Sequence, residues 1–133
     1  MAIIVRLPLA SGLLGGKLAK ETRFPKEDHR TYNRDGQFFN VGETFAGLPY
    51  ENAVELVDSL KPMVPPSFTM AQMAQRWILD FDAVTVVIAG ASRATQVNEN
   101  VSVSGLPPLG TDLHAKLKTF YEHQVARYIR GPY

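Results

Sequence analysis

The strongest candidate for a ligand site is an apolar run that ends at a glycine and continues as a polar segment, in residues 83–100. Residues 84–88 are rich in valine and isoleucine, the pattern of a strand buried on both faces of a parallel sheet. Gly90 allows the tight turn that follows such a strand. We therefore expect a strand, a turn and the beginning of a helix here.

The helix expected after this turn could bind an anion. Ser92 or Thr95 can cap its first turn, and its first backbone N–H groups point beyond the carboxyl end of the strand. With Arg93 beside them, these groups would attract a negative charge, for which a phosphate is the natural candidate. The spacing fits an ordinary βα unit without a ligand equally well, so both interpretations stay open.

A second candidate segment follows another apolar run near the N-terminus. Residues 2–9 are predicted to form a strand ended by Pro8, because proline cannot donate a hydrogen bond to a neighbouring strand. Residues 9–17 are small and rich in glycine, which lets the backbone approach a ligand, and Lys17 could meet a negative charge. A lysine after a glycine turn is more often simply hydrated.

Residues 18–50 are predicted to form a long loop, because they combine charges and turn formers with little periodicity. Connections of this length inside a compact domain tend to be functional, and the scattered aromatic side chains are expected to pin the loop down. Arg23 and Arg30 could contact a ligand, although surface positions and ion pairs are the commoner roles. His29 has no partner that would make a metal site.

Three further helices are predicted as scaffold. Residues 51–61 place their apolar side chains on one face, a capping box opens a helix over residues 69–81, and Thr111 can cap a last helix. The methionine and tryptophan side chains of the second helix are interpreted as core. His114 and His123 lack carboxylate or cysteine partners at ligand spacing and are interpreted as surface residues.

The composition indicates a single globular domain. The chain has 133 residues, of which 45% are hydrophobic, and its net charge of +1 argues against a nucleic-acid or polybasic membrane surface. The absence of cysteine excludes disulfides, thiolate metal sites and cysteine nucleophiles. Arg6 interrupts the N-terminal apolar run, which is too short for a membrane span and unlike a signal peptide, so a cytoplasmic protein is expected.

Two predicted strands make an incomplete sheet. A two-stranded parallel sheet with two apolar faces has open edges and too little partner surface to be stable alone. We therefore expect it to be completed by self-association or by a missing N-terminal part. The sequence also offers no nucleophile elbow, paired carboxylates, metal cluster or serine–histidine–acid set. It contains a binding apparatus without evident catalytic groups.

Four segments resemble the aldo-keto reductases, (β/α)₈ barrels that reduce carbonyls with NADPH. They are Leu-Pro-Leu-Ala-Ser-Gly-Leu-Leu-Gly-Gly-Lys at 7–17, Gly-Glu-Thr-Phe at 42–45, Ala-Gln-Arg-Trp-Ile-Leu at 74–79, and Ile-Ala-Gly-Ala-Ser-Arg at 88–93 with Gln96, Glu99 and Asn100. The resemblance covers essentially the whole chain. It implies one C-terminal segment, residues 1–133, in which residues 2–9 and 84–88 are the seventh and eighth barrel strands. The implied fold class is α/β, a partial TIM barrel with two parallel strands, a long loop and four or five helices.

The resemblance also implies an NADP(H) site at the C-terminal face of the barrel. The nicotinamide and pyrophosphate end would be lined by Pro8, Leu9, Ser11 and Lys17, and Arg23 would approach the cofactor from the long loop. The adenosine with its 2′-phosphate would be held by Gly90, Ser92, Arg93, Gln96, Glu99 and Asn100.

The chain departs from the family pattern at three positions. It has Arg6 where many relatives place an aromatic residue that stacks on the nicotinamide ring, Leu7 where they have serine, and Ala89 where they have proline. The family's catalytic aspartate, tyrosine, lysine and histidine belong to the first half of the barrel, so the resemblance assigns a catalytic role to no residue here.

Two functions follow as hypotheses. The first is the C-terminal, cofactor-binding portion of an NADP(H)-dependent aldo-keto reductase, which transfers hydride to a carbonyl substrate in the complete barrel and is inactive alone. The alternative is a stand-alone, non-catalytic remnant that binds a nucleotide or another chain. Open strand edges predict homo-oligomers in both cases.

Overall fold

Two short parallel strands, β1 (Ile4–Arg6) and β2 (Val86–Ile88), pair in the computed structural model, which describes residues 1–131. Ile4 is opposite Val86 and Arg6 is opposite Ile88, so both strands end at the same edge of the sheet. The predicted parallel pair is confirmed, although the strands are shorter than expected. β1 ends before Pro8, because Leu7 has a φ of +56° that turns the chain out of the extended conformation.

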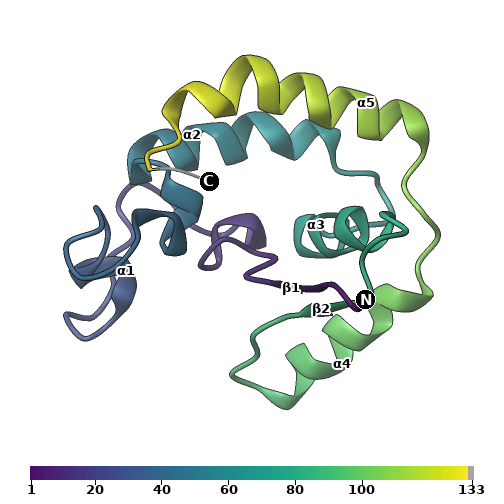
Figure 1. The fold of residues 1–133 in the computed structure, drawn as a ribbon, viewed down its shortest axis with the longest axis horizontal. Coiled ribbons are helices and arrows are strands. Elements are labelled where there is room, and N and C mark those ends of the chain that lie inside the picture. The colour runs from purple at the N-terminus through teal and green to yellow at the C-terminus, as the bar shows by residue number, and fades with distance from the viewer. Residues whose placement is uncertain (132–133) are drawn as a thin grey trace.

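Within residues 1–131, five α-helices accompany this sheet (Figure 1), in agreement with the four or five that the resemblance implies. In the figure, α2 and α5 run across the top of the molecule, α3 lies between them and the strands, and α4 lies at the bottom. A π-helical turn, Tyr121–Val125, continues the last helix. The bounds are α1 (His29–Tyr32), α2 (Tyr50–Leu60), α3 (Met70–Leu79), α4 (Ala94–Ser102) and α5 (Thr111–Phe120).

Local sequence signals explain how two of these helices begin. At α3 the predicted capping box is confirmed, since the Thr69 hydroxyl accepts from the Gln72 N–H at 3.1 Å and the Gln72 side chain accepts from the Thr69 N–H at 2.8 Å. At α5 the predicted cap is wrong. Thr111 is the first helical residue, and Gly110 occupies the cap position without a side-chain hydrogen bond.

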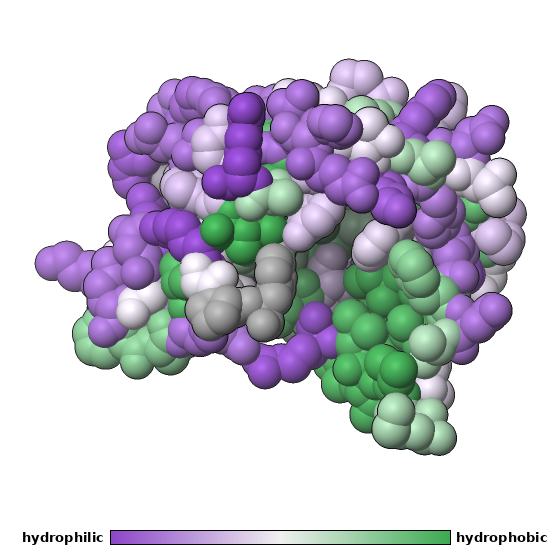
Figure 2. All heavy atoms as spheres, turned by 45° about the horizontal axis from the view of Figure 1, so that its top comes forward, coloured by the Kyte–Doolittle hydropathy of each residue, from purple (hydrophilic) through white to green (hydrophobic). Residues whose placement is uncertain are grey.

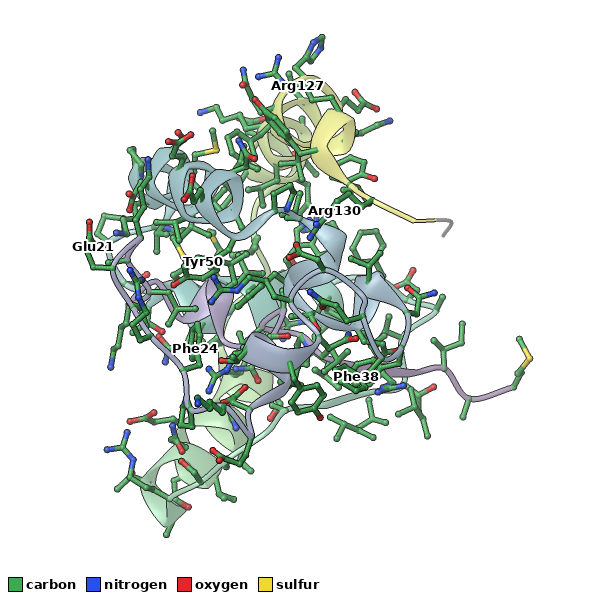
Figure 3. The ribbon with its side chains drawn as sticks, turned by 90° about the vertical axis from the view of Figure 1, so that its left-hand side faces the viewer. Glu21, Phe24, Phe38, Tyr50, Arg127 and Arg130 are labelled. Atoms are coloured by element: carbon green, nitrogen blue, oxygen red, sulfur yellow. The ribbon has the colours of Figure 1, made fainter. Side chains whose placement is uncertain are left out.

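The core lies around α2 and the segment predicted as a loop. Phe45 is fully buried, and its ring centroid lies 4.9 Å from that of Tyr50. Phe24 meets Tyr50 edge-on at 5.9 Å (Figure 3), so some aromatic side chains do pin the segment. Phe38 instead is 75% exposed. The segment also contains α1 and several 3-10 turns, so it is more ordered than a plain loop.

Polar groups hold this segment as well. Asn33 is fully buried, and its side-chain oxygen accepts from the N–H groups of Phe38 and Phe39, both at 2.9 Å. Arg130 lies where the chain leaves the last helical turns (Figure 3), and its guanidinium reaches the Gly47 carbonyl at 2.9 Å and the Asp35 carboxylate at 2.6 Å. These bonds tie the end of the described chain to residues far earlier in the sequence.

The strands are not buried on both faces, contrary to the prediction. Ile4 is 57% exposed and Ile88 is 58% exposed. The physical reason is that two strands and the described helices offer too few apolar faces to cover both sides of the sheet. On α3, Met70 and Met73 are buried as expected but Trp77 is exposed. Figure 2 shows the resulting broad apolar area on the surface.

Asp80 connects the end of α3 to the beginning of α5. Its carboxylate accepts hydrogen bonds from Arg76 at 2.8 Å, from the Leu109 N–H at 2.9 Å, and from His114 at 2.9 Å. His114 also stacks on Trp77, with ring centroids 6.2 Å apart. The interpretation of His114 as a surface residue without a carboxylate partner is therefore wrong, because its partner lies 34 residues away in the sequence.

The three donors also change the acidity of Asp80. Burial acts to raise the pKa of its carboxyl, but the hydrogen bonds from His114, Leu109 and Arg76 outweigh it and hold the pKa below its ordinary value of 3.8. A carboxyl with a lowered pKa in the folded state stabilises the fold above its ordinary pKa and loses this contribution as the pH falls.

We expect Asp80→Ala to lower the free energy of unfolding at pH 7 by about 3 kcal/mol, because it leaves three partly buried donors, one of them the Arg76 cation, without their acceptor. The difference from the wild type should shrink as the pH falls below 3.8. Urea unfolding followed by the fluorescence of Trp77, the single tryptophan, measures both effects. Asp82→Ala is the control at an exposed position, and an equal loss in both variants would contradict the role of Asp80.

Candidate functional site

The turn between β2 and α4 is closed by one carboxamide. The side-chain oxygen of Gln96 accepts from the Ser92 N–H at 2.8 Å, the Arg93 N–H at 3.1 Å and the Ser92 hydroxyl at 3.1 Å. The expectation that Ser92 or Thr95 caps the helix is wrong. Arg93 occupies the cap position, and Gln96 reaches back from the first turn to hold the preceding backbone.

Two further carboxamides, those of Asn100 and Gln75, hold the beginning of the same turn. The Asn100 side-chain nitrogen donates to the Gly90 carbonyl at 3.4 Å, and its oxygen accepts from the Gln75 side chain at 3.1 Å. Gln75 lies on α3 and is only 4% exposed. The turn after β2 is thus bound to α4, and α4 is bound to α3.

The six residues expected at the adenosine end lie together in the turn and in α4, but they differ in burial and in hydrogen bonding. Gln96 and Asn100 are half-buried and use their amides within the protein. Arg93 and Glu99 are exposed, so their charged groups face solvent beside the first and second turns of α4. An exposed guanidinium at the N-terminal end of a nine-residue helix is a favourable place for an anion.

Ser11 is the centre of the other candidate segment. Its hydroxyl lies 3.2 Å from the His29 ring nitrogen Nε2, accepts from the Phe45 N–H at 3.3 Å, and donates to the Glu43 carbonyl at 3.3 Å. A hydroxyl has one donor and two acceptor sites, so these contacts saturate it when His29 is the donor. Ser11 also has a φ of +60°, so the long segment holds it in a strained left-handed turn.

Helix α1 supports this turn with an ion pair. Arg30 donates from two guanidinium nitrogens to the Asp28 carboxylate, at 3.0 and 2.6 Å, and also reaches the Ser11 carbonyl at 3.4 Å. Hydrogen bonding from Arg30 lowers the pKa of Asp28 to about 2. The guanidinium carbon lies 4.2 Å from the centre of the Phe24 ring. Arg30 thus forms an ion pair, one of the roles that the sequence makes commoner for it than a ligand contact.

The remaining candidates lie in different surroundings. Pro8 is buried and lines an apolar cavity of about 260 Å³ with residues of α3 and α5. The Leu9 carbonyl accepts from the Leu14 N–H at 3.1 Å. Lys17 is exposed, and Arg23 turns back on its own segment to donate to the Lys20 carbonyl at 3.1 Å. Pro8 therefore packs toward the helices.

Sequence reasoning missed Gln75 and the contact of His29 with Ser11. Gln75 meets Asn100 across 25 residues of sequence, and His29 meets Ser11 across 18, so no local spacing indicated either contact. The described residues contain no group of three His, Asp or Glu side chains placed to hold a metal ion. Across the described helices, none combines the length and apolar character needed to span a membrane.

The chain is similar to a family model and to known proteins. The sequence model of the Aldo/keto reductase family matches residues 1–122. An L-glyceraldehyde 3-phosphate reductase from Escherichia coli K12 is 39% identical over 94 residues, which cover 71% of this chain and 26% of that protein. A probable voltage-gated potassium channel subunit beta from Arabidopsis thaliana is 31% identical over 113 residues, covering 80% of this chain and 30% of that protein. The chain spans between a quarter and a third of the length of these relatives.

A solved structure shares the fold. The glycerol dehydrogenase from Gluconobacter oxydans superposes with a TM-score of 0.71 and 22% sequence identity, covering 99% of this chain and 36% of that chain. The expected likeness to an α/β barrel of this family is therefore confirmed at the level of the fold.

The ion pair in α1 makes a prediction for Asp28. We expect Arg30→Gln to raise the pKa of the Asp28 carboxyl from about 2 toward its ordinary value of 3.8, because the main donor to the carboxylate is weakened. A carboxyl-carbon NMR titration measures this pKa directly. Arg23→Gln, at an exposed position with no contact to Asp28, should leave it near 2. An unchanged pKa in Arg30→Gln would mean that Arg30 does not control this carboxyl.

Proposed function

The chain belongs to the aldo/keto reductase family, and from this premise we propose that it forms the C-terminal, cofactor-binding portion of a cytoplasmic NADP(H)-dependent reductase. In the complete barrel the cofactor supplies a hydride to a substrate carbonyl, and this chain binds and orients the cofactor. The groups that protonate the carbonyl oxygen are assigned to another part of the barrel. The 133 residues alone are therefore expected to be inactive.

The observation that supports this proposal most is the common edge at which β1 and β2 end. Arg6 and Ile88 are paired, so the Ser11 turn and the Gly90 turn leave the sheet at the same end. Cofactor and substrate sites of such barrels are built from loops at the carboxyl ends of the strands. The two candidate segments thus have the placement that a single extended ligand would need.

The residues present fit a phosphorylated nucleotide. We assign Arg93 and the first turn of α4 to the 2′-phosphate, because an exposed guanidinium can bind a phosphate through two parallel hydrogen bonds. Gly90, Ser92, Gln96, Glu99 and Asn100 would form the rest of the adenosine end.

The turn around Ser11 is assigned to the other end of the cofactor. Pro8, Leu9, Ser11 and Lys17 would lie near the nicotinamide and pyrophosphate, and Arg23 would approach from the long segment. Because the Ser11 hydroxyl already contacts three groups of the protein, we assign this turn a role through its backbone and its shape.

The substrate is proposed only as a class. One relative is named as a reductase of L-glyceraldehyde 3-phosphate, a small aldehyde that carries a phosphate. We propose a small carbonyl compound as the substrate of the complete barrel.

A second proposal concerns self-association. The exposed apolar side chains of β1 and β2, together with the open edges of a two-stranded sheet, favour pairing with another copy. A homo-oligomer formed through these strands would also serve the alternative function, a non-catalytic remnant that binds a nucleotide or another chain.

We expect the full chain to give a saturable fluorescence change on titration with NADPH. Arg93→Ala should weaken NADPH binding by at least about tenfold, because it removes both charge-assisted hydrogen bonds to the 2′-phosphate, and NADH binding by less than about threefold. Arg127→Ala removes an equal charge from an exposed position in the last helical turns and should change neither affinity. Equal losses for both cofactors would argue against a 2′-phosphate contact. No response up to millimolar NADPH would remove cofactor binding from the chain.

We expect sedimentation of the chain to show concentration-dependent self-association. Ile88→Lys should shift the equilibrium to the monomer, because it places a charge on the exposed face of β2. Phe38→Lys changes an apolar residue of the long segment that is even more exposed, and it should leave the equilibrium unchanged. A wild type that stays monomeric, or identical behaviour of both variants, would contradict association through the strands.

A further inference from the structure

Gln75 is a buried amide on a helix whose other buried side chains are apolar. Met70 and Met73 are the buried apolar residues of α3, and Gln75 is 4% exposed. Burial of an amide opposes folding unless the amide is hydrogen bonded. An apolar side chain of similar size would fill this volume without that cost, so the position of the amide calls for a reason beyond packing.

The contact of Gln75 with Asn100 provides that reason. The Gln75 nitrogen Nε2 donates to Asn100 Oδ1 at 3.1 Å, which leaves the Asn100 nitrogen Nδ2 facing the Gly90 carbonyl at 3.4 Å. If the Asn100 amide were reversed, two donors would face each other at Gln75 and two acceptors would face each other at Gly90. The Gln75 donor and the Gly90 acceptor therefore together favour one of the two orientations of the Asn100 amide.

The Gly90 turn depends on such hydrogen bonds, because packing does little to hold it. Gly90 is exposed, and apart from its two chain neighbours no described residue comes within 4 Å of the place where a Cβ would stand. The bond from Asn100 fixes the beginning of the turn, and the bonds from Gln96 fix its end at Ser92 and Arg93. The backbone of the turn that carries Arg93 thus depends on both carboxamides.

We propose that Gln75 is a positioning residue for the adenosine end of the cofactor site. It orients the Asn100 amide, and through Asn100 it holds the turn that presents Arg93. The identity of the ligand rests on the proposed function, whereas the contacts from Gln75 to Gly90 do not. Because Arg93 is assigned to the 2′-phosphate, loss of this support weakens the binding of NADPH more than the binding of NADH.

Two substitutions separate positioning from general stability. Gln75→Met has a similar length and no hydrogen-bonding amide, so Asn100 loses its orienting donor. Gln72→Met removes one half of the capping box of the same helix and should lower the unfolding midpoint, but it does not touch Asn100. Gln75→Glu keeps the shape and reverses the preference, since its carboxylate accepts from Asn100 Nδ2 and competes with the Gly90 carbonyl.

The first measurement is an amide NMR spectrum of the full chain without ligand. We expect Gln75→Met and Gln75→Glu to shift the backbone signal that reports on Gly90 and the side-chain amide signals of Asn100. Gln72→Met should leave both in place. Unmoved signals at Gly90 and Asn100 in the Gln75 variants would overturn the proposal.

The second measurement is the titration of each variant with NADPH and with NADH. We expect Gln75→Met to weaken NADPH binding by up to about tenfold, less than Arg93→Ala because the guanidinium is still present, and NADH binding by less than about threefold. Gln72→Met should keep the wild-type ratio of the two affinities. An unchanged ratio in Gln75→Met would overturn the positioning role while NADPH binding by the wild type stands. A wild type that does not bind NADPH would overturn the proposed function, and the NMR signals would still decide whether Gln75 positions the turn.

Discussion

The parallel pairing of β1 with β2 is the constraint on which the rest of the structure depends. Segments more than 80 residues apart in the sequence meet in this pair, and its register brings the ends of both strands to one edge. A parallel pair needs a crossover connection, and here the connection contains the long segment, α2 and α3. Most of the buried core therefore lies in the connection between the strands, and the ends of the strands determine where the two candidate ligand-binding turns begin.

This arrangement separates the source of stability from the place of binding. The buried side chains cluster around α2, Phe45 and Leu13, whereas both strands remain exposed. Hydrogen bonds from polar groups hold the segments that lie outside this core. Asn33 and Arg130 fix the long segment, and Asp80 fixes α5 to α3. The exposed face of the two strands is where the partner elements of the proposed complete barrel would pack.

The sequence predicted the features that local signals encode. The apolar face of α2, the capping box of α3 and the strand–turn–helix around Gly90 each depend on residues within a few positions of one another, and each is present. The errors concern contacts across long separations. The burial of the strands depends on elements that would cover them, and the role of His114 depends on Asp80. The choice of Gln96 over Ser92 as the group that closes the turn depends on backbone geometry that spacing does not specify.

The family resemblance alone could not tell which residues of the candidate site hold the turn and which face a ligand. The resemblance placed six residues together around α4, but their hydrogen bonds divide them by chemistry. A carboxamide both donates and accepts, so Gln96, Asn100 and Gln75 can link backbone to side chain and one helix to another without adding charge. Neutral groups thus shape the turn after β2, and the exposed cation of Arg93 is left to meet a ligand. In the proposed cofactor site, the amides would determine where the charge points, and the charge would determine which cofactor binds.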